Sequence, residues 1–227
     1  MAKSKIIKQL VNNEITTKQA LERMLILAKD IKDRNLEQWI RNEIQGYEKN
    51  DTIPEYRKIP IYCIGTYDVG LTRAKNAPLP TIILDKVPQK EKEKFLHKYI
   101  EIPMEMLEQI IKNKEEVAES ISPENFQIFE YGTNIQVLSA KKVYDRIYLS
   151  KIIEKVRLKV IDILTELEKE FGCLDDLDIS IDDKNEAQRQ EIHNVINVII
   201  QDNHTDNSIT MGDENKVSNS TIANNQI

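Results

Sequence analysis

The chain has 227 residues and a formal net charge of −6, from 32 lysines and arginines against 38 aspartates and glutamates. With 40% hydrophobic and 31% charged residues it has the composition of an ordinary globular protein, which excludes collagen-like and wholly disordered chains. At roughly 150 residues per domain, this length predicts one compact domain with an appendage.

Targeting and redox signals indicate a cytoplasmic protein. The N-terminus is basic but is not followed by the apolar stretch of a signal peptide, so we expect none. The apolar runs are only a few residues long, far below the roughly 20 residues that cross a bilayer, and we expect no membrane span. Cys63 and Cys173 form no CxxC motif, which is typical of a protein in a reducing compartment. Two cysteines are also too few to form a structural zinc site.

Apolar residues at helical spacing predict helices throughout the first fifty residues. In the third of these, Glu43 lies between Trp39 and Tyr47 on one side of the helix, and Gly46 marks its end. The predicted helices cover the ranges 6–11, 20–31 and 36–47.

The next hundred residues predict a small antiparallel sheet and further helix. Residues 59–67 and 81–84 are rich in β-branched side chains and are bounded by proline, glycine and asparagine, which is typical of strands. A helix is expected over 89–119, interrupted near Pro103 because proline lacks the backbone N–H that a helix needs. Residues 126–129 are interpreted as one further strand.

The strongest helical signal covers residues 140–171. Its apolar residues form two stripes, of which the first is given below. The second stripe makes the apolar face wider than that of a coiled coil. We therefore interpret the segment as the central helix of the body's own core, and a subunit interface is the alternative. The first stripe recurs at alternating steps of four and three residues: Leu149, Ile153, Val156, Val160, Ile163 and Leu167.

The composition changes abruptly near the C-terminus. All thirteen aromatic residues lie before Gly172, whereas residues 182–227 hold nine asparagines and a net charge of −5. The acidic run at 175–183 lacks the glycine and the terminal glutamate of an EF-hand loop, and we interpret it as a solvated linker. The chain is thus divided into a body over 1–173, an acidic connector over 174–190 and an asparagine-rich tract over 191–227.

The C-terminal tract alternates isolated aliphatic residues with small polar ones. It opens with Val-Ile-Asn-Val-Ile-Ile at 195–200. The pattern predicts β-solenoid or β-prism strands that cover their aliphatic side chains only against copies of themselves, and therefore a homo-oligomer, a trimer or larger. The alternative is a polar tail without fixed structure. The predicted oligomerisation residues are Val195, Ile196, Val198, Ile200, Ile209, Val217, Ile222 and Ile227.

No motif for catalysis or metal binding is present. The three histidines form no HExxH, HxH or Cys/His arrangement, and the six glycines form no GxxxxGK[ST], GxGxxG or GxSxG. We therefore assign no catalytic residue, no metal site and no cofactor. The basic stretch 86–98 is interleaved with glutamates like a solvated helix face, so nucleic acid is not an expected partner.

One stretch resembles a known family. Residues 39–47, Trp-Ile-Arg-Asn-Glu-Ile-Gln-Gly-Tyr, are followed at 53–57 by Ile-Pro-Glu-Tyr-Arg, and this spacing resembles the signature of the AbiTii domain of bacterial abortive-infection proteins. The resemblance extends over most of residues 3–173. It implies a role in antiphage defence in a bacterial cytoplasm and transfers no catalytic residue. The motif supplies these candidates for a partner site or pocket: Trp39, Glu43, Gly46, Tyr47, Pro54, Tyr56 and Arg57.

The same motif also has a structural interpretation. We expect Glu43 to meet Arg57 as a buried or half-buried ion pair, while Trp39 and Tyr47 pack on the sheet. Such a pair is weak evidence for stability, although losing one partner is costly. In this interpretation the residues fix the junction between helix and strand, and a ligand or partner pocket is the alternative.

Taken together, the patterns predict an α+β fold: a mostly helical body with a small antiparallel sheet, followed by a β-rich, solenoid- or prism-like oligomerisation tract. The functional hypothesis is a non-enzymatic antiphage defence protein that acts by self-assembly and by binding a phage protein or an effector protein. The alternative is a toxin-like enzyme, such as a nuclease, whose carboxylates meet only in the fold.

Overall fold

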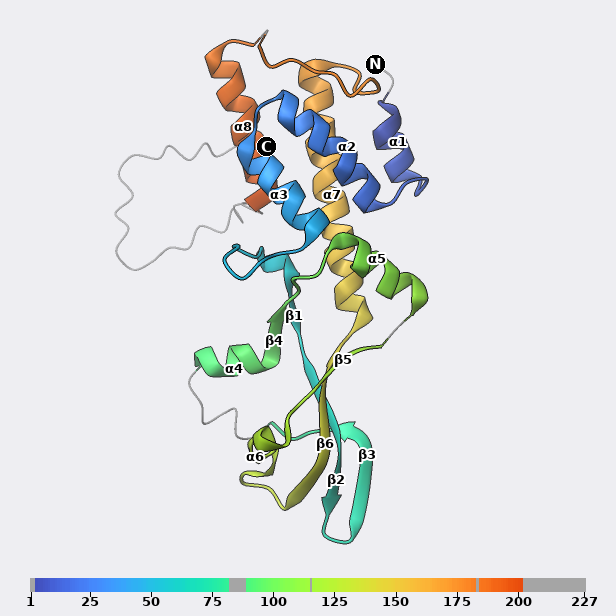
Figure 1. Cartoon of the computed structure of the whole chain (residues 1–227), viewed down its shortest axis with the longest axis vertical. Coiled ribbons are helices and arrows are strands. Elements are labelled where there is room, and N and C mark those ends of the chain that lie inside the picture. Colours follow the sequence, from blue (N-terminus) through green and yellow to red (C-terminus); the bar gives the residue numbers. More distant parts are fainter. Residues whose placement is uncertain (1–2, 82–88, 115, 183, 202–227) are drawn as a thin grey trace, which may run out of the picture.

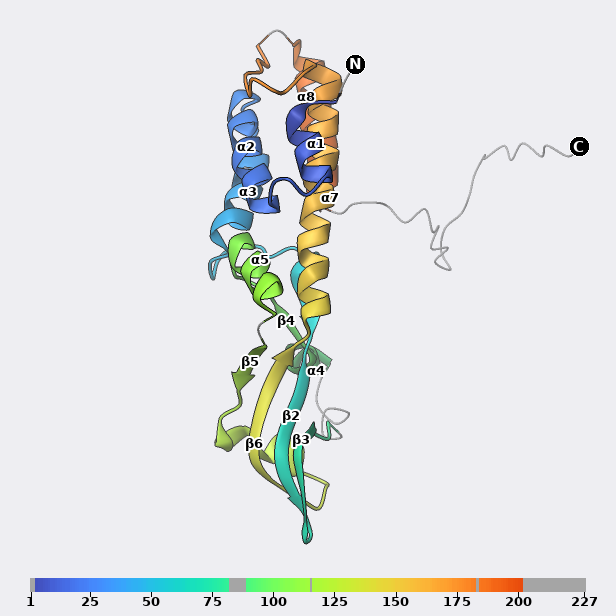
Figure 2. The ribbon, with the colours of Figure 1, turned by 90° about the vertical axis from the view of Figure 1, so that its right-hand side faces the viewer.

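The protein is elongated, with a bundle of helices at one end and a twisted sheet at the other (Figure 1). The computed structural model describes residues 3–81, 89–114, 116–182 and 184–201. Turning the molecule by 90° shows that the same long helix, α7, runs from the bundle to the start of the sheet (Figure 2).

The helical end consists of six helices, and their starts follow local capping chemistry. A capping box opens the second helix, since the Thr16 side chain accepts a hydrogen bond from the Gln19 backbone N–H and the Gln19 side chain accepts one from the Thr16 backbone N–H. Asp33 caps the third helix by accepting from the Leu36 N–H. The helices are α1 (Lys5–Val11), α2 (Thr17–Asp30), α3 (Arg34–Gln45), α5 (Met104–Asn113), α7 (Arg146–Phe171) and α8 (Glu186–Gln201).

Helix α7 is the centre of the core, as its apolar stripe predicted. It packs against α1, α2, α5 and α8. The helix begins at Arg146 rather than near residue 140, because residues 140–144 continue a strand of the sheet. The buried members of the stripe, all at most 1% exposed, are Leu149, Val156, Val160, Ile163 and Leu167.

The sheet end holds a four-stranded antiparallel sheet in the order β3-β2-β6-β5, and a second, two-stranded sheet joins β1 to β4. One face of the larger sheet carries a small core of its own, made of Leu79, Phe129, Val137 and Ala140. The strands are β1 (Lys58–Pro60), β2 (Tyr62–Val69), β3 (Thr72–Pro78), β4 (His97–Tyr99), β5 (Val117–Ser120) and β6 (Ile135–Tyr144). The helical elements at this end are α4 (Gln89–Leu96), α6 (Gln127–Glu130) and the 3₁₀ turn Pro123–Asn125.

Several sequence-based predictions in this region are wrong. Residues 126–129 were expected as a strand, but most of them form the short helix α6, because Phe126 and Phe129 are three residues apart and share one helical face against the sheet. The helix expected over 89–119 ends earlier and gives way to β4 and β5 at either end of α5. Strand β3 was not predicted because its polar and charged side chains lack an apolar alternation. The strand expected over 81–84 lies, except for its first residue, outside the described residues.

The expected β-structure over 195–200 is also wrong, because this segment belongs to α8. Ile192 and Ile196 are four residues apart and are buried against the bundle, so helical spacing prevails over β-branched composition. The remaining predicted oligomerisation residues, Ile209, Val217, Ile222 and Ile227, lie outside the described residues.

The acidic segment before α8 is part of the core. Leu174, Ile179 and Ile181 are buried, whereas the acids between them are exposed. The interpretation of this segment as a solvated linker therefore holds for the acids but is wrong for the apolar residues. The apolar residues pack into the core and close the end of the bundle between α7 and α8. Within the described part of the chain, no helix has the length and apolarity that crossing a bilayer would require.

Candidate functional site

A buried carboxylate, that of Glu43 on α3, is the centre of the predicted motif. Its Oε2 accepts a hydrogen bond from Arg57 Nη2 at 2.6 Å, and both side chains are 0% exposed. Its Oε1 accepts from the hydroxyls of Tyr47 at 2.6 Å and Tyr56 at 2.7 Å. The predicted Glu43–Arg57 ion pair is therefore confirmed as a fully buried one, with the carboxylate satisfied by three side chains.

Arg57 connects this carboxylate to the chain segment that enters α5. Its Nη1 donates to the carbonyl oxygens of Ile100 at 2.7 Å and Ile102 at 3.0 Å, and its guanidinium lies 4.8 Å from the centre of the Tyr47 ring. Because Arg57 is the last residue of the 3₁₀ turn Glu55–Arg57 that leads into β1, it joins the helical bundle to the strands. This is the junction role that the structural interpretation predicted.

Gly46 allows α3 to end against the same segment. Its φ of +92° is in the left-handed half of the backbone map, and a Cβ there would come within 2.7 Å of the Glu101 carbonyl oxygen. The next residue, Tyr47, donates its backbone N–H to that carbonyl at 2.8 Å. Glycine is thus required at position 46 for two backbones to approach each other.

The aromatic residues extend the network to the surface. Trp39 donates its indole N–H to the Tyr56 hydroxyl at 2.8 Å, and that hydroxyl in turn donates to Glu43. Trp39 packs in the helical core, not on the four-stranded sheet as expected, because α3 lies in the bundle. Pro54 accepts the Arg57 N–H at 3.0 Å through its carbonyl and so shapes the turn that carries Tyr56.

Burial and the Glu43 charge fix the protonation states of this network. Burial raises the pKa of Tyr47 and of Tyr56 far above the ordinary phenol value, and the Glu43 carboxylate raises both further. Burial alone would lower the pKa of Arg57, but the adjacent carboxylate outweighs it and the pKa is raised. Both phenols therefore remain neutral hydrogen-bond donors, and Arg57 remains charged.

Lys159 on α7 is a member of this site that sequence reasoning missed. It is 3% exposed, its Nζ lies 5.3 Å from the centre of the Tyr56 ring, and it donates to the carbonyls of Ile199 and Ile200 at the end of α8. A cation at the C-terminus of a helix is favourable because the helix dipole is negative there. The signal in the sequence is a lone lysine between Val156 and Val160 on the apolar stripe.

A groove of about 580 Å³ lies over this network. One wall is the outer face of α3, the second is the loop between α3 and β1, and the end of α8 closes one side. Four of the seven motif candidates line it, whereas Glu43, Gly46 and Arg57 do not. The lining residues are Asn35, Gln38, Trp39, Asn42, Tyr47, Asn50, Asp51, Thr52, Ile53, Pro54, Glu55, Tyr56, Ile200 and Gln201.

The described oligomerisation candidates lie in different environments on α8. Ile196 is fully buried in the bundle, and Ile200 lines the groove. Val195 and Val198 are 38% and 47% exposed. Of the oligomerisation candidates on α8, only these two valines are exposed.

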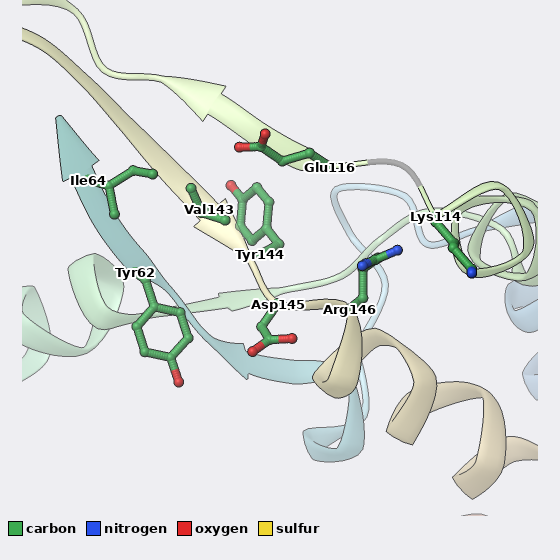
Figure 3. A pocket seen from close by; sticks show the side chains of 8 residues that line it. All are labelled: Tyr62, Ile64, Lys114, Glu116, Val143, Tyr144, Asp145 and Arg146. Carbon is green, nitrogen blue, oxygen red and sulfur yellow. The ribbon is translucent and has the colours of Figure 1, made fainter. Parts of the chain in front are cut away.

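A second cavity, of about 380 Å³, lies where the bundle meets the sheet. Figure 3 labels its lining residues, which include Tyr62 and Ile64 on β2 and Val143 and Tyr144 on the neighbouring strand β6. The others are Asp145 and Arg146 where α7 begins, and Lys114 and Glu116 between α5 and β5. The carboxylate of Glu116 pairs with Lys141 on the sheet. Among the described residues, no group of three or more His, Cys, Asp or Glu side chains is arranged to hold a metal ion.

Comparison with known proteins identifies the family. Neither the curated proteins nor the solved structures contain a significant match to this chain. The family model for AbiTii, however, matches residues 4–193, and so includes the groove walls on α3 and in the loop as well as the first half of α8. This confirms the resemblance carried by the Trp39–Tyr47 stretch. The chain belongs to the AbiTii family.

Proposed function

We propose that this protein is an antiphage protein of abortive infection, as the family name suggests, and that it acts by recognising a polypeptide segment of a phage or effector protein in the α3 groove. The observation that carries the proposal is the groove itself. Its base is a hydrogen-bonded aromatic network, and its rim is lined by amides.

The chemistry of the groove is suited to polypeptide recognition. Trp39, Tyr47 and Tyr56 offer apolar faces and polar ends, and such residues dominate the energetics of protein interfaces. Asn35, Gln38 and other amides can pair with the backbone of an extended segment. Because the aromatic hydroxyls and the indole are held by Glu43 and by one another, binding would cost little side-chain entropy.

The test uses two matched substitutions on one helix. Gln38 and Gln45 are both exposed on α3, but only Gln38 lines the groove. A Gln38→Arg change places a long cation in the groove and should weaken partner binding by about tenfold or more, as a loss of roughly 1.4 kcal/mol implies. Plating efficiency of a phage panel on cells expressing each variant measures the effect.

Gln38→Arg is expected to lose protection, whereas Gln45→Arg keeps it. Both variants should keep the wild-type melting temperature, because exposed substitutions away from packed features change stability by about 0.5 kcal/mol or less. Equal protection by the two variants at equal protein levels would remove the groove from the mechanism.

Self-assembly is proposed as the setting for this recognition, through the outward face of α8. Val195 and Val198 support it, because they are exposed on a helix whose other side is packed on α7 and α3. Several bodies in one assembly would raise avidity without new contacts. A Val195→Glu/Val198→Glu variant should lower the mass measured by light scattering, whereas Val11→Glu, at another exposed valine, should not.

A further inference from the structure

We propose that residues 217–227 of the chain itself occupy the α3 groove when no partner is bound, so that a partner must displace them. This inference rests on the proposed function, since it assigns a regulator to the same recognition site. In this proposal the C-terminal aliphatic residues are buried against their own chain, and not against other copies of the chain as the sequence analysis predicted.

The position of α8 provides the first argument. Ile200 and Gln201, the last two described residues, both line the groove. The carbonyls of Ile199 and Ile200 are held by the buried Lys159, and Asn197 accepts a hydrogen bond from Asn35 on α3. The chain therefore leaves α8 at the rim of the groove, from a point fixed on both neighbouring helices.

The second argument is the chemical match. Twelve of the fourteen groove-lining residues are uncharged, and the two charged ones, Asp51 and Glu55, are both acidic. A suitable occupant therefore carries no negative side chains and combines aliphatic anchors with hydrogen-bonding groups. Residues 217–227, Val-Ser-Asn-Ser-Thr-Ile-Ala-Asn-Asn-Gln-Ile, contain no charged side chain and place aliphatic residues at every fifth position.

The third argument is reach. Sixteen peptide units separate Gln201 from Val217, which allows roughly 50 Å in an extended chain. A tether of this length gives an effective concentration in the millimolar range, well above the concentration of sister copies in a dilute solution. The same chain, rather than a second copy, is therefore the favoured occupant.

The experiment measures binding of a fluorescein-labelled peptide with the sequence of residues 217–227 to the full-length protein. In one variant, Val217→Ser/Ile222→Ser/Ile227→Ser, the aliphatic anchors become polar and the charge of the segment stays the same. In the matched control, Ser218→Ala/Thr221→Ser/Asn225→Gln, three polar positions of the same segment change while its anchors and its charge stay the same.

The anchor variant should bind the peptide about ten- to a hundredfold more tightly than wild type, because its own segment no longer competes at millimolar effective concentration. The control variant should resemble wild type. Adding Gln38→Arg to the anchor variant should abolish peptide binding, which would locate the peptide in the groove.

Other outcomes overturn the proposal. Equal affinity of wild type and anchor variant would mean that the segment does not occupy the groove, and absence of binding to either would mean that the groove does not accept it. Competition that disappears on dilution, together with a larger mass for wild type, would identify a sister copy as the occupant. All of these readouts use purified protein, so they stand apart from the phage assay that tests the proposed function.

Discussion

The two ends of the molecule are stabilised in different ways. The helical end contains a large continuous core that includes the α7 stripe, together with all of the buried charged side chains that the structure describes: Asp33, Glu43, Arg57, Lys159 and Glu168. The sheet end depends on a small apolar core of Leu79, Phe129, Val137 and Ala140. Buried charges need partners in fixed positions, so the helical end is the region where geometry is specified most tightly.

This difference bears on function, because the groove lies over the network around two of these charges, Glu43 and Arg57. A site whose side chains are already held in place loses little entropy when it binds. The sheet end has no comparable network among its described residues. We therefore expect changes in the two regions to differ in size and in kind.

The largest effect is expected from Arg57→Met. This change leaves the Glu43 carboxylate buried without its cation, and breaking a buried pair from one side costs about 3–5 kcal/mol. Urea unfolding of the purified protein would measure the loss. Glu43→Gln in the Arg57→Met background should recover part of it, because no buried charge then remains unpaired, and a double variant no more stable than Arg57→Met would contradict this account.

A smaller effect is expected at the sheet end from Val137→Ala. Removing two methyl groups from this small core should cost about 2 kcal/mol. Hydrogen exchange should show faster exchange in β2 and β6 than in wild type, while amides of α3 and α7 keep their protection. Equal loss of protection at both ends would mean that the two cores unfold as one unit.

A pH-dependent effect is expected at the other end of the bundle. Burial would raise the pKa of Glu168, but hydrogen bonds from Lys3 and Ser4 and the Lys3 charge lower it to about 2. A depressed carboxyl pKa stabilises the fold above the unfolded value of 4.5, and this contribution is lost as the pH falls toward 2. The stability difference between wild type and Glu168→Gln should therefore shrink between about pH 5 and pH 2, and a constant difference would count against the pairing.

Sequence patterns located much of the helical end and little of the sheet end. Periodicity identified α2, α3 and α7 because their apolar faces are long and are covered by one core, and the motif identified the Glu43–Arg57 pair. Strand β3 was missed because its side chains are polar, and helix α6 was predicted as a strand because so short an element takes its form from its neighbours. At the site, the sequence places Lys159 on an apolar stripe, but it does not reveal the partners of Lys159 or the Ile100 and Ile102 carbonyls, because these contacts depend on long-range packing.

The error at 195–200 has a similar cause. Val195 and its β-branched neighbours favour strands in isolation, but Ile192 and Ile196 cover the bundle at helical spacing. Tertiary contact therefore decided the conformation.

The most direct test of the central claim uses Trp39, the only tryptophan of the chain, which gives a single indole signal in a nitrogen–proton correlation spectrum. Its N–H donates to Tyr56 at the base of the groove. Titrating the anchor variant with the 217–227 peptide should shift this signal until it saturates, and the shifted position should match that of the full-length wild type. A signal that stays unchanged throughout the titration would contradict the assignment of the groove as a polypeptide-binding site.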